Sequence, residues 1–374
     1  MKRRKKSIIL AIGLILGILS VFLLGEAALA QEKPRAVYIA PNLSNVFDVV
    51  LAKNWQQKLT ALGVEAVVKS AENDSKREAD EWNIAIASKY SAIVGGPVDS
   101  SAVITSVKKA NKAGIPVFML GRTCSGGRVV LSSRADNVSL GTFAAEEVVR
   151  RLKAKYGEEK GLVLEIQGEM ASTNARVRSE SINAVFKKYP KIRVISKPTH
   201  WLDSEFHDIT KSVAAANPDL AAITMGSDVI YGVDAALKSL GKLKPIGDPK
   251  HIIIVGIDAD PRILGLIKQG LWDASALQDA VGYGTILAQR MAELLAGKFE
   301  IKTTEFVLKD YDLKKHKFMN MRGLISNPGR PDDGVPVYRT QQPEGWELMT
   351  PSRIVDKSNI DDPDLWGNMI KQFQ

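Results

Sequence analysis

Short runs rich in Val and Ile alternate along the chain with longer segments of helical period. The runs lie at residues 36–40, 64–69, 92–95, 116–120, 162–167, 192–197, 221–225 and 252–257. The helical segments between several of them stop at Gly63, Gly114, Gly157 and Gly241, and glycine is a common residue at a helix C-terminus. This alternation is typical of parallel sheets covered by crossover helices, so we predict an α/β protein.

The strand and helix units fall into two sets, separated by a turn-rich segment at residues 123–128. One doubly wound sheet is the alternative, but a single core stops growing at about 250–300 residues. We therefore expect two Rossmann-like lobes with parallel sheets joined by a three-segment hinge. The first would contain residues 36–135 plus 279–304 and the second residues 136–278 plus 305–322, with crossings near 135/136, 278/279 and Glu305.

Both ends of the sequence differ in composition from the middle. Residues 1–30 have a basic start, an apolar run and small residues at Ala28 and Ala30, which is the layout of a cleavable signal peptide. An uncleaved anchor is the alternative, because the run approaches the ~18 residues of a spanning helix. We expect cleavage and a periplasmic or otherwise extracytoplasmic protein. Residues 323–374, rich in Pro and Gly, form a C-terminal extension expected to lie over a lobe, with Trp346 and Trp366 as packing anchors.

Composition excludes several functional classes. The net charge is +9, and its basic excess is spread along the chain, so we expect no nucleic-acid partner. The single cysteine, Cys124, cannot form an intramolecular disulfide, and no Cys/His cluster has the spacing of a metal site. We expect no cofactor. Since no nucleophile–base pair or phosphate loop is visible either, we predict that the protein is not an enzyme.

Polar and aromatic residues follow the predicted strands. In open α/β sheets ligands bind beyond the carboxyl ends of the strands, so these residues are candidates for a binding site. Aromatic plates and planar polar groups match the C–H face and the hydroxyl groups of a sugar. Because an unpaired buried polar group costs ~1–3 kcal/mol, such a site rejects ligands without matching hydroxyls. The candidates are Asn45, Phe47, Asp48, Arg122, Arg178, Trp201, Ser227, Asp258 and Gln278.

Five short motifs occur in a fixed order: Asn45-x-Phe47, Arg122 after Ile-Pro-Val-Phe-Met-Leu-Gly, Ala135-Asp136-Asn137, Ala175-Arg176-x-Arg178, and Val255-Gly256-Ile257-Asp258. With them, residues 36–310 resemble the type I periplasmic sugar-binding proteins of the ribose- and galactose-binding group. The resemblance implies an exported solute-binding protein that captures a small polyhydroxylated ligand, a monosaccharide, between two lobes. It implies delivery of that ligand to the membrane permease of an ABC importer, for carbohydrate transport.

The resemblance also implies roles for single residues. Asn45 would hydrogen-bond the ligand, Phe47 and Trp201 would stack on it, and four residues would bond its hydroxyls: Arg122, Arg178, Asp258 and Gln278. Three positions depart from the family. Where the family usually has an aspartate, a second aromatic residue and an asparagine, this chain has Gly121, Asp48 and Ser227, respectively. Because of these departures, the ligand can also be another pentose, a hexose, a polyol, an inositol, a nucleoside, a signalling molecule or a charged molecule.

Other interpretations stand beside these. Phe47 can pack into the core of the first lobe, Trp201 can cover the lobe interface, and the partner of Asp258 can be the ligand or Arg122. A ligand-sensing input for a chemoreceptor or sensor kinase is the alternative function. The ligand-binding core of a cytoplasmic repressor is disfavoured by the export signal and by the lack of an N-terminal helix-turn-helix. We expect a monomer.

Overall fold

The computed structural model describes residues 33–228, 231–298, 337–339, 346–350 and 352–373. The predicted signal peptide at residues 1–30 and the predicted crossing near Glu305 lie outside the described residues. Two sheets, each mostly parallel and covered by helices, confirm the predicted α/β class with two lobes. Within the described residues, we find no helix with the length and apolar character needed to cross a membrane.

The sheet of the first lobe has the strand order β11-β12-β5-β4-β3-β1-β2, and only β11 runs antiparallel to its neighbour. Its strands are β1 (Arg35–Ala40), β2 (Glu65–Ser70), β3 (Ala92–Gly95), β4 (Val117–Leu120), β5 (Leu131–Ala135), β11 (Val337–Arg339) and β12 (Trp346–Thr350).

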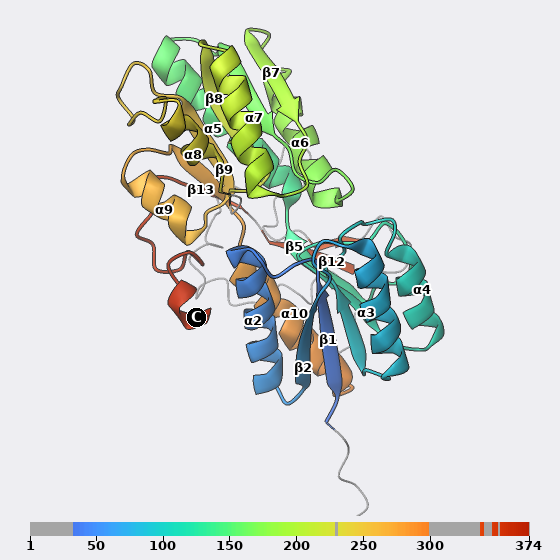
Figure 1. Cartoon of the computed structure of the whole chain (residues 1–374). Helices are drawn as coiled ribbons and strands as arrows, with labels where there is room; N and C mark the ends of the chain where they lie inside the picture. The colour runs from blue at the N-terminus through green and yellow to red at the C-terminus, as the bar shows by residue number, and fades with distance from the viewer. Residues whose placement is uncertain (1–32, 229–230, 299–336, 340–345, 351, 374) are drawn as a thin grey trace, which may run out of the picture. The chain divides into compact units, whose positions relative to one another are not determined.

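Helices cover both faces of this sheet. Figure 1 shows α2 (Val46–Ala61) and α10 (Ala280–Leu295) on one face, and α3 (Ser75–Ala87) and α4 (Ile104–Lys112) on the other. Strand β1 explains why both faces are covered, since Tyr38 packs into the core under α2 whereas Val37 and Ile39 pack into the core under α3 and α4. A strand that is apolar on both faces needs a helical layer on each.

The sheet of the second lobe has the order β13-β10-β9-β8-β6-β7, and only β13 is antiparallel. Figure 1 shows α5 and α6 on one face and α7 and α8 on the other. Its strands are β6 (Gly161–Ile166), β7 (Ile192–Lys197), β8 (Leu220–Met225), β9 (Ile253–Asp258), β10 (Ala274–Leu277) and β13 (Ile354–Val355). Its helices are α5 (Asn137–Tyr156), α6 (Thr173–Phe186), α7 (Asp203–Ala216), α8 (Val233–Ser239) and α9 (Pro261–Lys268), and a short 3-10 helix, η2 (Ile370–Phe373), follows.

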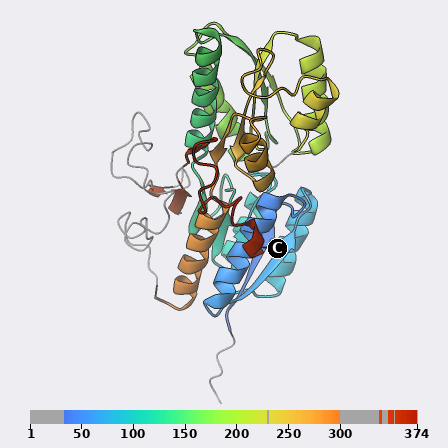
Figure 2. The same cartoon turned by 90° about the vertical axis from the view of Figure 1, so that its left-hand side faces the viewer.

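The chain passes between the lobes in three places within the described residues. Strand β5 ends in the first sheet at Ala135 and α5 begins in the second lobe, while β10 ends in the second sheet and α10 returns to pack beside α2 (Figure 2). The third passage joins β12 of the first sheet to β13 of the second, between Thr350 and Ile354. The expectation that residues 323–374 lie over a lobe is therefore wrong for these strands, because they pair within the sheets.

Helix α5 begins at Asn137, directly after the crossing from the first lobe. Asp136 is its N-cap, and the Asp136 carboxylate accepts from the backbone N–H of Val138 and Ser139 at 3.1 and 3.3 Å. The amide of Asn137 donates to Asn174. The carboxylate takes the cap because a helix N-terminus favours negative charge.

Candidate functional site

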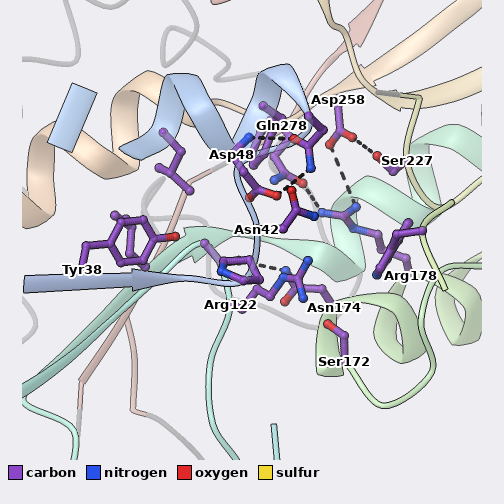
Figure 3. A pocket seen from close by; sticks show the side chains of 17 residues that line it. Tyr38, Asn42, Asp48, Arg122, Ser172, Asn174, Arg178, Ser227, Asp258 and Gln278 are labelled. Atoms are coloured by element: carbon purple, nitrogen blue, oxygen red, sulfur yellow. Dashed lines mark hydrogen bonds and ion pairs between the residues drawn. The ribbon is translucent and has the colours of Figure 1, made fainter. Parts of the chain in front are cut away.

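A pocket between the two lobes is lined by residues from the carboxyl ends of the strands and from the helices that follow them. Figure 3 shows Arg178, Asp258 and Gln278 close to one another at one side of this pocket. All nine residues predicted from the sequence line it: Asn45, Phe47, Asp48, Arg122, Arg178, Trp201, Ser227, Asp258 and Gln278. The structure thus brings every predicted site residue together.

The start of α2 supplies three of these residues. Asn45 is the N-cap, and its side chain accepts from the Asp48 N–H at 2.8 Å while its amide donates to Asp48 Oδ2 at 2.7 Å. This reciprocal pair resembles a capping box and fixes both side chains. Phe47 belongs to the core of the lobe and also lines the pocket, so both interpretations of this residue describe its position.

The backbone conformation at Gly121 favours glycine over a residue with a side chain, such as the aspartate that is usual at this position in the family that the sequence resembles. Its φ of 72° lies in the left-handed region, and an added Cβ would come within 2.9 Å of Leu51 Cδ2. Its carbonyl oxygen accepts from Asn174 Nδ2 at 2.8 Å, across the lobe boundary. The hydrogen-bond acceptor at this position is therefore the main chain.

Arg122 extends beyond Gly121, and its Nη1 donates to the carbonyl oxygen of Pro97 at 3.3 Å. Burial raises the pKa of Asp48, and the positive charge of Arg122 acts in the opposite direction. Arg122 is thus the main counter-charge of Asp48 in the pocket.

Arg178 is buried and organises the side of the pocket formed by the second lobe. Its Nε donates to Asn137 Oδ1 at 2.7 Å, its Nη1 to the Gly226 carbonyl at 2.6 Å, and its Nη2 to Gln278 Oε1. Gln278 in turn donates from Nε2 to the hydroxyl of Tyr283 at 3.0 Å. With this many bonds, the guanidinium fixes the orientation of Gln278 before any ligand enters.

Asp258 ends β9 with an unusual φ of 126°. Ser227 Oγ donates to its Oδ2, and Arg178 Nη1 lies 4.0 Å from its Oδ1. Its charge partner is therefore Arg178 rather than Arg122. Burial raises the pKa of Asp258 to about 7, although the Arg178 charge and the Ser227 bond lower it. Among the described residues, Oδ1 has no hydrogen-bond partner, so it is available as an acceptor.

Trp201 follows β7 and reaches the pocket because a neighbouring position, Gly168, has no side chain. A Cβ on Gly168 would lie 1.9 Å from the indole ring of Trp201. The indole Nε1 is buried, and no described residue accepts its hydrogen. Trp201 thus offers a flat apolar face and a free donor.

Eight further residues, which we did not predict as site residues from the sequence, also line the pocket. They are Tyr38, Pro41, Asn42, Leu51, Leu120, Gly121, Ser172 and Asn174. The most informative is Asn174, which bonds both Gly121 and Asn137. Asn174 stands in the segment that contains Arg178, and Asn42 lies two residues after the end of β1, so their place in segments that follow strands was an available signal.

The pocket lining has equal numbers of acidic and basic side chains. The acidic ones are Asp48 and Asp258, and the basic ones are Arg122 and Arg178. The remaining polar lining consists of amides and hydroxyls, and Phe47, Trp201 and Tyr38 are aromatic. Among the described residues, no group of three or more His, Cys, Asp or Glu is placed to hold a metal ion. The lining suits a small neutral molecule with several hydroxyl groups.

Comparisons with known proteins agree with this geometry. The family model "Periplasmic binding protein domain" matches residues 36–299. A D-apiose import binding protein of Actinobacillus succinogenes is 28% identical over 246 residues, which are 65% of this chain and 76% of that protein. A ribose import binding protein of Bacillus subtilis is 26% identical over 269 residues, 71% and 83% of the two chains.

A solved structure has the same fold. It is an ABC transporter solute-binding protein from Bacillus halodurans with bound myo-inositol, with a TM-score of 0.69 and 20% identity, and the match covers 90% of this chain and 99% of that one. Since the family model spans most of the chain, and the two lobes and the pocket between them have the expected form, the chain belongs to the periplasmic binding protein domain family.

Proposed function

We propose that the protein is a solute-binding protein that captures a neutral monosaccharide or cyclic polyol between its lobes and delivers it to an ABC importer. The matched proteins are named for D-apiose and ribose import, and the structural neighbour holds myo-inositol. These names support a polyhydroxylated ligand of that size. They leave the identity of the sugar to experiment.

The observation that carries the proposal is a pocket lined by two acidic and two basic side chains together with amides, hydroxyls and aromatic rings. An anionic ligand would need an excess of positive groups, and Asp48 and Asp258 oppose it. A neutral polyol instead uses both signs, because each hydroxyl donates one hydrogen bond and accepts others. In this arrangement Asp258 Oδ1 accepts a ligand hydroxyl, and Trp201 covers an apolar C–H face.

A thermal-shift screen of the purified protein tests the ligand class. The probes are D-ribose, D-allose, D-apiose, D-arabinose and myo-inositol, with adenosine and D-gluconate as a nucleoside and an anion. A ligand at about 100 times its dissociation constant adds about 2.7 kcal/mol of stability, which raises the melting temperature by several degrees. A shift with a neutral sugar or polyol supports the proposal, and a shift with gluconate or adenosine alone contradicts it.

Two neighbouring residues provide a matched pair of variants. Trp201→Ala removes a pocket aromatic, whereas Leu202→Ala changes the next residue, which is 48% exposed and does not line the pocket. Trp201→Ala should weaken binding of the probe by tenfold or more, since a stacked aromatic contributes about 0.5–1.5 kcal/mol in addition to the apolar area that it buries. Equal affinities of the two variants would contradict the proposed site.

The remaining parts of the proposal concern the cell. We propose a monomer that is exported by a cleaved signal peptide, acts outside the cytoplasm and performs no chemistry on its ligand. Uptake of the radiolabelled probe should depend on this protein and on a cognate permease. A chemotactic or kinase response without uptake would assign it to sensing, and chemical turnover of the probe would make it an enzyme.

A further inference from the structure

The C-terminal segment 352–373 runs behind the pocket and contacts both lobes. Strand β13 pairs with β10 in the second lobe, and the carbonyl oxygen of Phe373 accepts from Lys53 Nζ of α2 in the first lobe at 2.7 Å. In Figure 2 the red end of the chain lies beside α2, drawn in blue. The two contacts place the segment across the boundary between the lobes.

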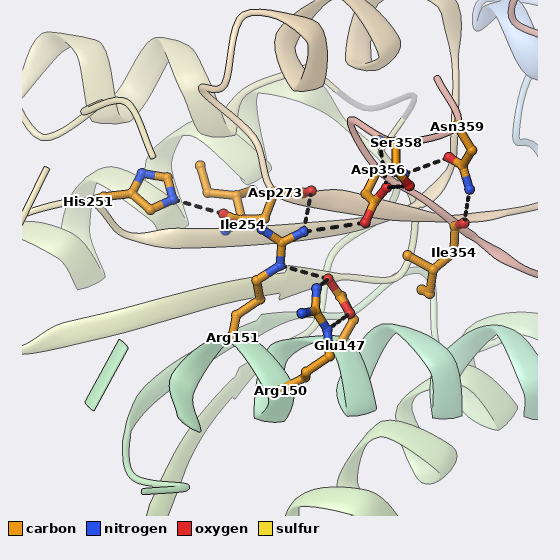
Figure 4. A network of polar contacts seen from close by, with 10 residues as sticks. All are labelled: Glu147, Arg150, Arg151, His251, Ile254, Asp273, Ile354, Asp356, Ser358 and Asn359. Atoms are coloured by element: carbon orange, nitrogen blue, oxygen red, sulfur yellow. Dashed lines mark hydrogen bonds and ion pairs between the residues drawn. The ribbon is translucent and has the colours of Figure 1, made fainter. Parts of the chain in front are cut away.

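A partly buried polar network fixes the start of this segment on the second lobe (Figure 4). Arg151 of α5 bonds Glu147 at 2.7 Å and Asp273 at 3.3 Å, and its Nη2 lies 3.8 Å from Asp356 Oδ2. Asn359 donates back to the carbonyl oxygen of Ile354 at 2.9 Å. These contacts hold residues 354–359 in one position relative to α5 and β10.

Trp366, later in the same segment, contacts one pocket residue from each lobe. It is buried, and its Nε1 donates to the carbonyl oxygen of Asp258 at 2.7 Å. Its ring packs edge-to-face against Phe47, with 5.7 Å between ring centroids. Trp366 itself does not line the pocket.

The bond to Asp258 falls where the backbone is strained. Asp258 and the next residue, Ala259, have φ values of 126° and 61°, which side chains other than glycine rarely adopt. Such conformations persist only where surrounding contacts hold them. Gly367 shows how close those contacts are, because a Cβ there would lie 2.9 Å from the Ala259 carbonyl oxygen.

We propose that Trp366 is a positioning residue for the ligand pocket, which holds the Asp258 backbone through its indole N–H and the Phe47 ring through its edge. The inference rests on the proposed function. Without the indole, Asp258 is free to relax to an ordinary φ, and its carboxylate then turns away from Ser227 and Arg178. Phe47 loses the ring that fixes its angle. Both changes weaken ligand contacts although Trp366 never touches the ligand.

Two substitutions separate the contributions. Trp366→Phe keeps an aromatic ring against Phe47 and removes the N–H, whereas Trp366→Ala removes both. Trp272→Phe is the control, because Trp272 is also 1% exposed in the second lobe, lies outside the pocket lining, and has no described hydrogen-bond partner for its Nε1. All three variants lose a buried indole, so a purely structural effect appears in the control as well.

Affinity for D-ribose, D-allose and myo-inositol is measured by titration calorimetry. We expect Trp366→Phe to weaken binding about fivefold, because it removes one hydrogen bond worth about 1 kcal/mol. Trp366→Ala, which also removes the ring, should weaken binding more than tenfold. Trp272→Phe should bind like the unchanged protein. Unchanged affinity in Trp366→Phe overturns the proposal, and this variant decides the question if Trp366→Ala does not fold.

Amide hydrogen exchange without ligand keeps this test separate from that of the proposed function. The Ala259 N–H donates to Ser275 Oγ at 2.9 Å, and this bond depends on the local backbone. If the unchanged protein binds none of the probes, the proposed function fails, and exchange then decides the inference. Exchange at Ala259 about fivefold faster in Trp366→Phe than in Trp272→Phe supports it, and equal exchange overturns it.

Discussion

Replacement of Arg178 by Met tests whether the buried pair with Asp258 stabilises the second lobe. The two charges lie 4.0 Å apart, and at an effective dielectric constant of ~20 this distance corresponds to an attraction of about 4 kcal/mol. Met fills a similar volume without charge, so Asp258 is left buried without its partner. Removal of one member of a buried pair costs about 3–5 kcal/mol, and we expect Arg178→Met to lower the free energy of unfolding by that amount at pH 9.

The pH dependence follows from the pKa of Asp258, which burial raises to about 7. When the pKa of a carboxyl group is higher in the folded than in the unfolded protein, the protein loses stability as the pH rises from the unfolded pKa to the folded pKa. Above the folded pKa this group causes no further loss. Loss of Arg178 raises the folded pKa again. The free energy of unfolding of the variant therefore keeps falling above pH 7, by up to about 1.4 kcal/mol per pH unit. The difference in this free energy between the variant and the unchanged protein widens from pH 7 to 9.

Urea unfolding of the ligand-free protein, followed by circular dichroism at pH 5, 7 and 9, measures this gap. Asp258→Asn provides the second arm of a double-mutant cycle, because it removes the carboxylate that Arg178→Met leaves unpaired. The double variant should be more stable than the sum of the single effects predicts, by about 2 kcal/mol at pH 9. Additive effects within about 0.5 kcal/mol, or a gap independent of pH, would refute the reasoning.

Two glycines give further predictions. Gly168→Ala places a Cβ 1.9 Å from the Trp201 ring, so the ring must move. The affinity for the sugar, measured by calorimetry, should then fall tenfold or more. The control is Gly265→Ala in α9, whose Cβ meets no atom within 4 Å and should leave the affinity unchanged. Gly121→Asp restores the residue usual in the sugar-binding relatives but forces an L side chain to φ 72° against Leu51, so thermal unfolding should show a loss of about 1–3 kcal/mol. A Gly168→Ala protein with unchanged affinity, or a Gly121→Asp protein that melts at the original temperature, would contradict these arguments.

The strands predicted from sequence were those made of buried β-branched runs. Each of the predicted runs is a strand in the structure, with bounds shifted by a residue at most at either end. Strands β5 and β10 were missed because Leu131–Ala135 and Ala274–Leu277 contain serines and an arginine where β-branched residues were expected. Their burial comes from neighbours in the sheet, which composition does not reveal.

The site residues were predictable because topology places every strand end at one edge of its sheet. Their partners were not predictable. The pairing of Asp258 with Arg178 and the support of Asp258 by Trp366 join segments that lie far apart in the sequence. The contact between Trp366 and Asp258 also depends on the passage of the chain between Thr350 and Ile354, which the sequence did not indicate.

The position of that third passage has a consequence for how the protein folds. Strands β12 and β13 pair with β5 and β10, which would otherwise be edge strands, and β12 and β13 come much later in the sequence than the strands with which they pair. Until β12 and β13 have been synthesised, β5 and β10 expose unpaired backbone groups and can pair with other chains. Pairing between such remote segments is also slow. The nascent chain therefore passes through a state in which both sheets are incomplete, and this state is the one most open to chaperones and to aggregation.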